Sequence, residues 1–210
     1  MTPAPPNPRT CCATNDKVSQ AAWQQRYIEG AIGWDRGKPS PQLHKWLADE
    51  AIEPCRILIP GCGRGHEVIA LAEREFSVTG IDFADSAITY LRQEQRLRKL
   101  QFDVIQTDLF AYQPSEPFDA VYEQTCLCAI DPSQWETYEQ LLCCWTKPGA
   151  TLLASFMQSD ASEGPPFSCD LKSMRQLFPA SRWHWHDTID RVEHPTGMHE
   201  LACRLTRNSG

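Results

Sequence analysis

The stretch Ile57-Leu58-Ile59-Pro60-Gly61-Cys62-Gly63-Arg64-Gly65, followed by an apolar segment that closes at Asp82, decides the fold of this chain. A strand-like run ends in three closely spaced glycines, a helix follows, and the next strand stops at a carboxylate. Glycines in such a turn let a ligand lie against bare backbone, and an acid about twenty residues further on can hold a ribose diol. The sequence therefore predicts a site for a cofactor that contains adenosine.

The spacing of the glycines indicates which cofactor is bound. A dinucleotide site usually reads G-x-G-x-x-G, which seats a pyrophosphate on the N-terminus of a helix. Here Gly61, Gly63 and Gly65 read G-x-G-x-G, the form usual in sites for S-adenosylmethionine (SAM), which carries an amino-acid moiety in place of the pyrophosphate. Glycine is also common in such turns for steric reasons alone. The position of Asp82 after the turn supports the interpretation of this spacing as a cofactor site. We therefore expect SAM as the cofactor.

Composition and charge narrow the class of protein. A length of 210 residues suits one domain, and the net charge of −7 argues against nucleic acid as a partner. Residues 1–15 lack an apolar signal core and no run approaches about twenty apolar residues, so we expect a cytoplasmic protein without a membrane partner. The ten cysteines include two adjacent pairs and no paired C-x-x-C, which favours reduced, buried thiols over disulfides or a metal site.

Strand and helix patterns alternate along the chain, which predicts an α/β fold with a doubly wound, mostly parallel sheet that ends in an antiparallel hairpin. Residues 1–15 are expected to form a flexible tail and 16–210 a single domain, in which a helix at 18–29 and a loop at 30–41 form an N-terminal lid. The expected strands are 56–59, 77–81, 102–106, 120–122, 151–156, 182–192 and 199–207. The expected helices are 42–49, 67–73, 86–99, 133–145 and 171–178.

The ends of the predicted strands supply candidate contacts for the adenosine. Asp82 is predicted to hold the ribose hydroxyls, with Phe83 against the adenine. Asp108 follows the third strand and is a candidate acceptor for the adenine amino group, while the amide of Leu109 would donate to the ring. Glu123 and Gln124 end the fourth strand, at the sheet edge where doubly wound folds bind ligands. We expect Gln124 to face the methyl acceptor and Glu123 to lie near the amino group of the cofactor.

Four stretches of the chain resemble the thiopurine S-methyltransferase superfamily, and more closely its thiol, thiocyanate and halide methyltransferase branch. They are Gly33-Trp34-Asp35-Arg36-Gly37-x-Pro39-x-Pro41, Ile59-Pro60-Gly61-Cys62-Gly63-Arg64-Gly65, Phe118-Asp119-x-Val121-Tyr122-Glu123-Gln124-Thr125-x-Leu127-Cys128-Ala129-Ile130, and Gly164-Pro165-Pro166-Phe167. The resemblance implies the seven-stranded, Rossmann-like class I methyltransferase fold, SAM as methyl donor, and a small soft nucleophile as acceptor. It also implies that Trp23, Tyr27 and Trp34 contact the cofactor, with Trp34 and the Gly164–Phe167 segment forming a lid.

One departure from the family pattern bears on the acceptor. The thiopurine branch has an arginine in a W-D-R-G segment where this chain reads Tyr122-Glu123-Gln124-Thr125. Thiopurine is therefore a poor candidate, and a thiol, thiocyanate, halide or related chalcogen compound is expected. Such nucleophiles need alignment and exclusion of water more than a strong base. We accordingly give Gln124 and Trp34 the roles closest to the chemistry, and we expect no metal.

Two other functions fit the glycine loop and Asp82. The first is an NAD(P)-binding oxidoreductase, which would need a second lobe or a hydride-relay pair that the sequence does not display. The second is a SAM-binding sensor without catalysis, which would need neither the aromatic lid nor an acceptor pocket. The sequence favours the methyltransferase over both, and it predicts no particular oligomeric state.

Overall fold

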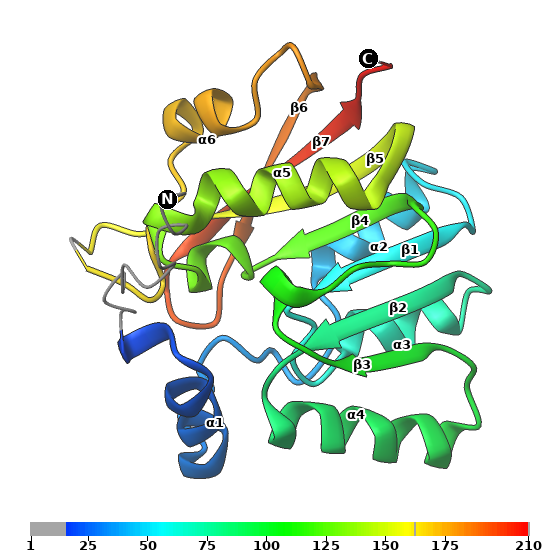
Figure 1. Cartoon of the computed structure of the whole chain (residues 1–210), viewed down its shortest axis with the longest axis vertical. Coiled ribbons are helices and arrows are strands. Elements are labelled where there is room, and N and C mark those ends of the chain that lie inside the picture. Colours follow the sequence, from blue (N-terminus) through cyan, green and yellow to red (C-terminus); the bar gives the residue numbers. More distant parts are fainter. Residues whose placement is uncertain (1–15, 162, 210) are drawn as a thin grey trace, which may run out of the picture.

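A computed structural model describes residues 16–161 and 163–209, so the predicted tail lies outside the described residues. A seven-stranded sheet runs through the molecule in the order β3-β2-β1-β4-β5-β7-β6 (Figure 1). The first five strands are parallel, β7 is antiparallel to β5, and β6 is antiparallel to β7. The strands are β1 (Arg56–Pro60), β2 (Ser77–Asp82), β3 (Asp103–Gln106), β4 (Phe118–Gln124), β5 (Thr146–Gln158), β6 (Trp183–Glu193) and β7 (His199–Arg207).

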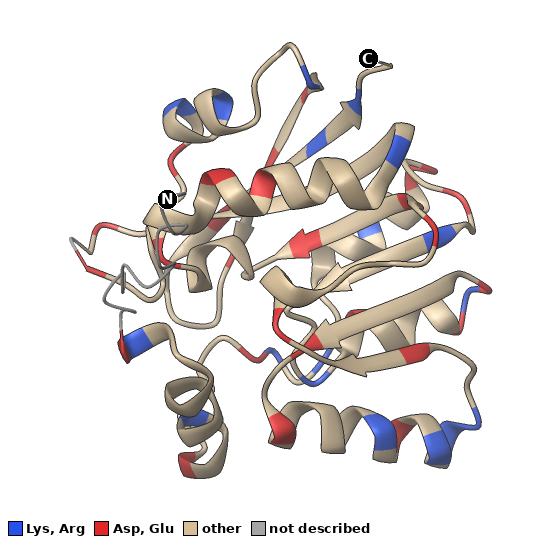
Figure 2. Cartoon of the chain, viewed as in Figure 1, with Lys and Arg blue, Asp and Glu red and all other residues tan. Residues whose placement is uncertain are grey.

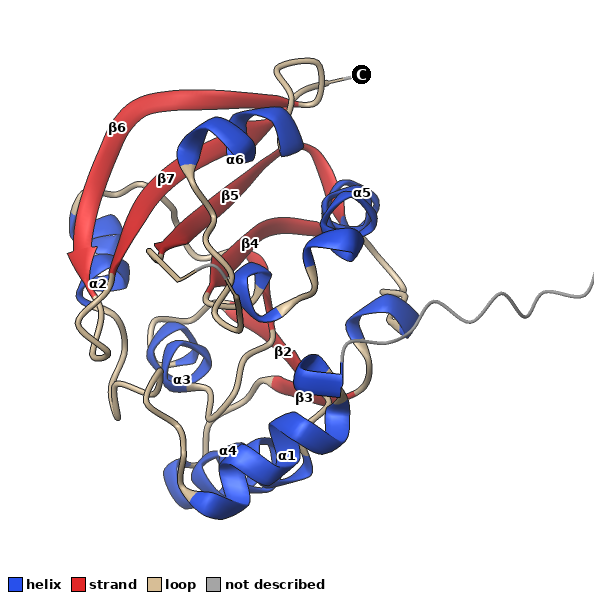
Figure 3. Cartoon of the chain, turned by 90° about the vertical axis from the view of Figure 1, so that its left-hand side faces the viewer, coloured by secondary structure: helices blue, strands red, loops and turns tan. Residues whose placement is uncertain are grey.

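Helices cover both faces of the sheet, as Figures 1 and 3 show. They are α1 (Gln20–Glu29), α2 (Pro41–Ala48), α3 (His66–Ala72), α4 (Asp85–Arg98), α5 (Trp135–Trp145) and α6 (Leu171–Leu177), with short 3-10 turns η1 (Asp16–Val18), η2 (Leu109–Ala111), η3 (Leu127–Ala129) and η4 (Pro132–Gln134). Alternate side chains of each strand point to opposite faces. In β1, for example, Leu58 joins the core beneath α5 and α6, whereas Ile57 and Ile59 join the core beneath α2 and α3.

The predicted fold class and all seven predicted strands are confirmed. The largest difference is at the start of β5, which begins at Thr146 rather than at residue 151. Pro148 and Gly149 lie in this added portion, where Gly149 has a φ of +82° and the register against β4 shifts. Proline followed by glycine predicts a break in a strand. Here the two residues lie in an irregular extension at the start of β5 instead.

Local sequence signals set the ends of the helices. Ser19 accepts a hydrogen bond from the amide of Ala22 and so caps α1, which ends at Gly30 in the left-handed conformation. The predicted helix at 133–145 divides into η4 and α5, and Asp131 caps the first of them. The apolar side chains of α5 pack into the core.

The helix α1 stands apart from the sheet and packs beside α4 (Figure 3). Three hydrogen bonds hold it there: Gln24 Nε2 donates to Ser86 Oγ at 2.7 Å, Gln24 Oε1 accepts from the Ser86 amide at 3.1 Å, and Gln20 Nε2 donates to the Phe83 carbonyl at 2.8 Å. No residue of α1 is fully buried. Polar side-chain contacts therefore hold the helix beside the end of β2, and its role as a lid stays a prediction.

Charged side chains of both signs are interspersed over the described residues, and the described helices contain no long apolar segment. Figure 2 shows lysine and arginine spread over many elements, with one group towards the end of α4. Within that group Arg98 is paired with Glu94 and Glu73. Over the described part of the chain, no helix is both long and apolar enough to cross a membrane.

Candidate active site

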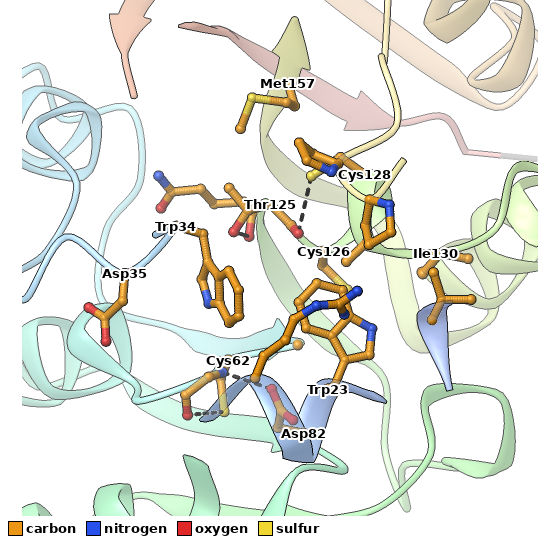
Figure 4. A pocket seen from close by; sticks show the side chains of 18 of the residues that line it. Trp23, Trp34, Asp35, Cys62, Asp82, Thr125, Cys126, Cys128, Ile130 and Met157 are labelled. Carbon is orange, nitrogen blue, oxygen red and sulfur yellow. Dashed lines mark hydrogen bonds between the residues drawn. The ribbon is translucent and has the colours of Figure 1, made fainter. Parts of the chain in front are cut away.

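A cavity of about 850 Å³ opens at the carboxyl ends of the parallel strands. Its wall is drawn from α1, the loop after α1, the glycine turn after β1, and the ends of β2, β4 and β5 (Figure 4). This volume lies in the range of small-molecule sites, and its position is where doubly wound sheets bind ligands. All predicted site residues except Gly65 and Glu123 line this cavity.

The glycine turn fits closely against neighbouring side chains. Gly61 and Gly63 have φ angles of +58° and +53°, in the left-handed region that favours glycine. A Cβ on Gly61 would lie 2.8 Å from Cys126 Sγ, and one on Gly63 would lie 2.9 Å from the Tyr27 hydroxyl. A side chain at either position would clash with Cys126 or Tyr27, so only backbone atoms face the cavity here.

Gly65 has a different role from the one predicted. It caps the start of α3 with a φ of +71°, and a Cβ there would lie 2.4 Å from Leu91 Cδ1. The third glycine therefore lets α3 pack closely against α4 and does not reach the cavity. This is a packing function, which the sequence spacing alone does not distinguish from ligand contact.

Asp82 ends β2 and is only 7% exposed. Its Oδ2 accepts from the Gly63 amide at 2.9 Å and its Oδ1 accepts from the Ala84 amide at 2.8 Å. Burial raises the pKa of this carboxyl, and the amide hydrogen bonds oppose that rise. Each carboxylate oxygen has more than one lone-pair site, so Asp82 can shape the glycine turn and still accept from a ribose diol.

The candidate adenine contacts lie along the same wall. Phe83 follows Asp82 directly, and Asp108 caps η2 by accepting from the Phe110 amide at 2.9 Å. Leu109, the first residue of η2, also lines the cavity. The carboxylate of Asp108 thus has a structural partner and keeps free acceptor sites, and its contact with an adenine stays a prediction.

Three aromatic rings gather where α1 meets the following loop. The Trp34 ring lies edge-on to Trp23, with centroids 5.1 Å apart, and to Tyr27 at 5.7 Å. The Arg26 guanidinium lies 4.3 Å from the Trp23 ring centroid. Figure 4 shows Trp23 and Trp34 on the same side of the cavity, near Asp82. The structure therefore brings together the three aromatic residues that the sequence predicts for this site.

Asp35 ties this loop to the glycine turn. Its Oδ1 lies 2.8 Å from His66 Nε2 and accepts from the Gly37 amide at 2.7 Å, and its Oδ2 lies 3.4 Å from Arg64 Nη1. The hydrogen bond to Asp35 raises the pKa of His66. Burial alone would raise the pKa of Asp35, but the bonds from His66 and Gly37 outweigh it, and the pKa falls. The loop and the start of α3 are thus joined by the hydrogen bond between Asp35 and His66.

The opposite end of the cavity is lined by apolar and sulfur-bearing side chains. These are Cys128, Ile130, Met157, Pro165, Pro166 and Met198, whereas Cys126 lies against Gly61 at the glycine turn. Burial raises the pKa values of the Cys126 and Cys128 thiols well above their ordinary value, so both stay protonated near neutral pH. Phe167 donates its amide to the Cys128 carbonyl at 2.8 Å, which holds the Gly-Pro-Pro-Phe segment over this end.

Gln124 lines the cavity, but protein groups use much of its hydrogen-bonding capacity. Its Oε1 accepts from the Tyr122 hydroxyl at 2.9 Å, and its Nε2 donates to Glu200 Oε2 at 3.1 Å. Tyr122 and Gln124 share a face of β4 because they are two residues apart. The predicted contact between Gln124 and the acceptor stays a prediction.

Glu123 differs from its predicted position near the cofactor. It lies between Tyr122 and Gln124, so its side chain points to the other face of β4, and it is 1% exposed. Its Oε1 accepts from the Leu127 amide at 2.6 Å. Burial raises the pKa of this carboxyl to about 7. Glu123 therefore holds η3 behind the cavity wall, and strand alternation already separates it from Gln124.

Sequence reasoning missed Arg36, His194 and Glu200. Arg36 and His194 line the cavity, and Glu200, at the start of β7, accepts from Arg36 Nη2 at 2.9 Å. Arg36 belongs to the Gly33–Pro41 motif and lies two residues after Trp34, which the sequence predicts for the site. His194 and Glu200 carry no local signal, because they reach the site only through the pairing of β6 and β7.

The strand order, the glycine turn after β1 and the buried carboxylate of Asp82 at the end of β2 together define a class I SAM-dependent methyltransferase. The family described as thiopurine S-methyltransferase (TPMT) matches residues 18–202. The chain belongs to this family, and its cofactor is SAM. Family membership decides against the oxidoreductase and the sensor that the sequence left open.

Curated relatives fall into two groups. The chain is 29% identical to a probable thiol methyltransferase 2 of Arabidopsis thaliana over 164 residues, which cover 76% of this chain and 72% of that protein. It is 26% identical to a thiocyanate methyltransferase 1 of the same plant over 163 residues, with the same coverage. It is also 26% identical to a thiopurine S-methyltransferase of Pseudomonas putida (strain GB-1) over 207 residues, 90% of this chain and 96% of that protein.

Solved structures share the fold at lower identity. A 1,6-didemethyltoxoflavin-N1-methyltransferase of Burkholderia thailandensis, solved with S-adenosylhomocysteine, gives a TM-score of 0.79 at 17% identity and covers 97% of this chain and 93% of that chain. A SAM-dependent methyltransferase of Methanosarcina mazei gives 0.68 at 19% identity, covering 82% of this chain and all of that chain. These likenesses support the architecture, and the acceptor must be argued from the site itself.

Proposed function

We propose that this enzyme methylates a small, soft nucleophile such as a thiol, thiocyanate, halide or related chalcogen compound. The observation that carries the proposal is the sulfur-bearing wall of the cavity away from the glycine turn, formed by Cys128, Met157 and Met198. Sulfur is polarizable and makes favourable contacts with soft groups. Because the Cys128 thiol is held protonated, it lines the pocket without competing as a nucleophile.

Residues of this chain would hold the cofactor at the other end. Asp82 would accept from the ribose, Phe83, Asp108 and Leu109 would contact the adenine, and the Gly61–Gly63 backbone would face the amino-acid moiety. When bound, SAM supplies a methyl group on a cationic sulfonium that an in-line lone pair can displace. The ring faces of Trp23, Tyr27 and Trp34 would attract that cation, by roughly 0.5–2 kcal/mol where a face is turned to it.

The enclosure of the cavity suits this chemistry. Displacement needs the reactants aligned and water excluded. The Trp34 loop closes one side, and Pro165 and Pro166 close the other. A soft anion or thiolate is already a competent nucleophile, so the walls contribute chiefly by positioning it. The relatives named for thiol and thiocyanate methylation have acceptors of this kind.

The test is a screen for formation of S-adenosylhomocysteine from SAM. Thiocyanate, iodide, hydrosulfide, thiophenol and 6-mercaptopurine are supplied separately, with SAM alone as the blank. We expect kcat/KM for at least one small acceptor to exceed that for the thiopurine by tenfold or more. A preference for the thiopurine, or product formation no higher than the blank with every acceptor, would contradict the proposal.

A further inference from the structure

Behind the cavity wall, a buried carboxylate of the C-terminal hairpin holds Gln124. Glu200 lies in β7, opposite Met157 in the register with β5, and is 0% exposed. Gln124 Nε2 donates to Glu200 Oε2 at 3.1 Å and lies 3.4 Å from Oε1. Gln124 itself is half-buried and lines the cavity, as Met157 does. A fully buried acid thus contacts a side chain that a ligand can reach.

The ion pair with Arg36 makes Glu200 an acceptor only. Arg36 Nη2 donates to Glu200 Oε1 at 2.9 Å, and the Arg36 side chain is itself only 12% exposed. Burial raises the pKa of the Glu200 carboxyl, and the hydrogen bonds from Arg36 and Gln124 oppose that rise. A carboxyl paired with a guanidinium is ionised and has no hydrogen to donate. Glu200 can therefore satisfy only the NH₂ end of the Gln124 amide.

Tyr122 holds the other end of the same amide. Its hydroxyl donates to Gln124 Oε1 at 2.9 Å, and the Tyr122 side chain is 1% exposed. If the amide turned over, its carbonyl oxygen would face the Glu200 carboxylate and its NH₂ group would face the hydroxyl proton. Buried polar groups that lose their partners in this way are destabilised. The orientation of the Gln124 amide is therefore fixed from both ends.

The fixed amide keeps one N–H group that the protein does not use. Nε2 carries two hydrogens on diverging bonds, and the oxygens of a single carboxylate lie too close together to accept both. Glu200 supplies the acceptors that the described residues offer to this nitrogen. Because Gln124 lines the cavity, a ligand there can accept from the second N–H group.

We propose that Glu200 is a positioning residue, which fixes the Gln124 amide so that the wall offers an N–H group to the reacting atom of the methyl acceptor. This inference rests on the proposed function and adds the group that orients its acceptor. A hydrogen bond to one lone pair of the nucleophilic atom leaves another lone pair for in-line attack. A carbonyl oxygen in the same place would repel those lone pairs. The C-terminal hairpin thereby contributes to the reaction through a residue that does not touch the substrate.

The test exchanges the two hydrogen-bonding partners. Glu200→Gln lets residue 200 meet either end of the Gln124 amide, so that amide can turn over. Gln124→Glu places two carboxylates together and offers the cavity no N–H group. In the double variant the amide at position 200 donates to the carboxylate at position 124, so the wall regains its hydrogen bond while the cavity meets only oxygen. Glu53→Gln and Gln101→Glu, at exposed positions, are the matched controls.

The readouts are kcat/KM with SAM and the urea midpoint. We expect kcat/KM for thiocyanate, hydrosulfide and thiophenol to fall about tenfold or more in all three variants, with affinity for S-adenosylhomocysteine within about twofold of wild type. The urea midpoint should fall furthest in Gln124→Glu and recover in the double variant, so that stability returns without activity. If the double variant recovers kcat/KM together with its midpoint, or if Glu200→Gln keeps wild-type kcat/KM, Glu200 is only structural and the inference is overturned.

Calorimetry separates this inference from the proposed function. Each of the three compounds is titrated into wild type and Glu200→Gln, both saturated with S-adenosylhomocysteine. If wild type binds a compound but methylates none, the proposed function fails, and an affinity about tenfold weaker in Glu200→Gln still supports the positioning role. Equal affinities overturn that role, and so does a wild type that binds none of the compounds. If Gln124→Glu does not fold, Glu200→Gln and the double variant carry the test.

Discussion

Replacing Asp82 with asparagine tests the central contact of the cofactor site. In the protein, each carboxylate oxygen accepts from one backbone amide, Gly63 at 2.9 Å and Ala84 at 2.8 Å. Asparagine has one carbonyl oxygen and one NH₂ group, so one of these amides would face a donor. A buried amide left unpaired costs about 1–3 kcal/mol, and we expect the free energy of unfolding to fall by that amount.

Loss of the charge has a second effect, on binding. A hydrogen bond to a charged acceptor contributes about 1.5–3 kcal/mol, so a ribose held by Asp82 should bind roughly 10- to 150-fold more weakly in Asp82→Asn. Calorimetry with SAM measures this, and urea unfolding measures the stability term separately. Asp85→Asn, at an exposed position in the first turn of α4, is the matched control. SAM affinity within about twofold of wild type in a folded Asp82→Asn variant would refute the ribose contact.

Two further predictions concern the lid and the buried carboxyl behind the wall. Trp34→Ala removes the edge contacts with Trp23 and Tyr27, each worth about 0.5–1.5 kcal/mol, so the free energy of unfolding should fall by about 1–3 kcal/mol. Because the ring is proposed to cover the cofactor, kcat/KM of the folded variant should also fall about tenfold or more; wild-type kcat/KM would show that the ring only packs. Burial raises the pKa of Glu123 from 4.5 to about 7, so the folded protein keeps a proton that the unfolded chain has lost, and stability should fall as pH rises through this window. Urea midpoints at pH 5 and pH 8 should therefore differ less in Glu123→Gln than in wild type, and parallel profiles for the two proteins would contradict this assignment.

The fold was predictable because its signals are local. Each parallel strand is a short apolar run bounded by turn residues, and capping side chains mark the start of some helices, such as Ser19 at α1 and Asp131 at η4. The start of β5 was not, because Pro148 and Gly149 read as a break. Their strand assignment depends on pairing with β4, which is a property of the assembled sheet and not of the local sequence.

The site was predictable only where it follows the chain closely. Asp82 and the aromatic residues of α1 lie in or beside recognisable motifs. Glu123 was predicted beside Gln124, but alternation along β4 turns its side chain to the other face, where it accepts from the Leu127 amide behind the cavity wall. Glu200 meets Arg36 across 164 positions of sequence, and the turn that holds His194 carries no motif. Only the folded hairpin brings these residues to the cavity.

One loop connects the two halves of the cavity through adjacent residues. Asp35 binds His66 at the start of α3, on the cofactor side, while Arg36 binds Glu200 and the Glu193 carbonyl on the acceptor side. The Arg36 side chain keeps its place in the cavity wall only while the loop is held in this position. A cofactor that contacts Trp34 and the glycine turn would stabilise that position and so tighten acceptor binding. Because such coupling is reciprocal in free energy, thiocyanate should raise the affinity for S-adenosylhomocysteine by the same factor, and Asp35→Asn should reduce both effects together.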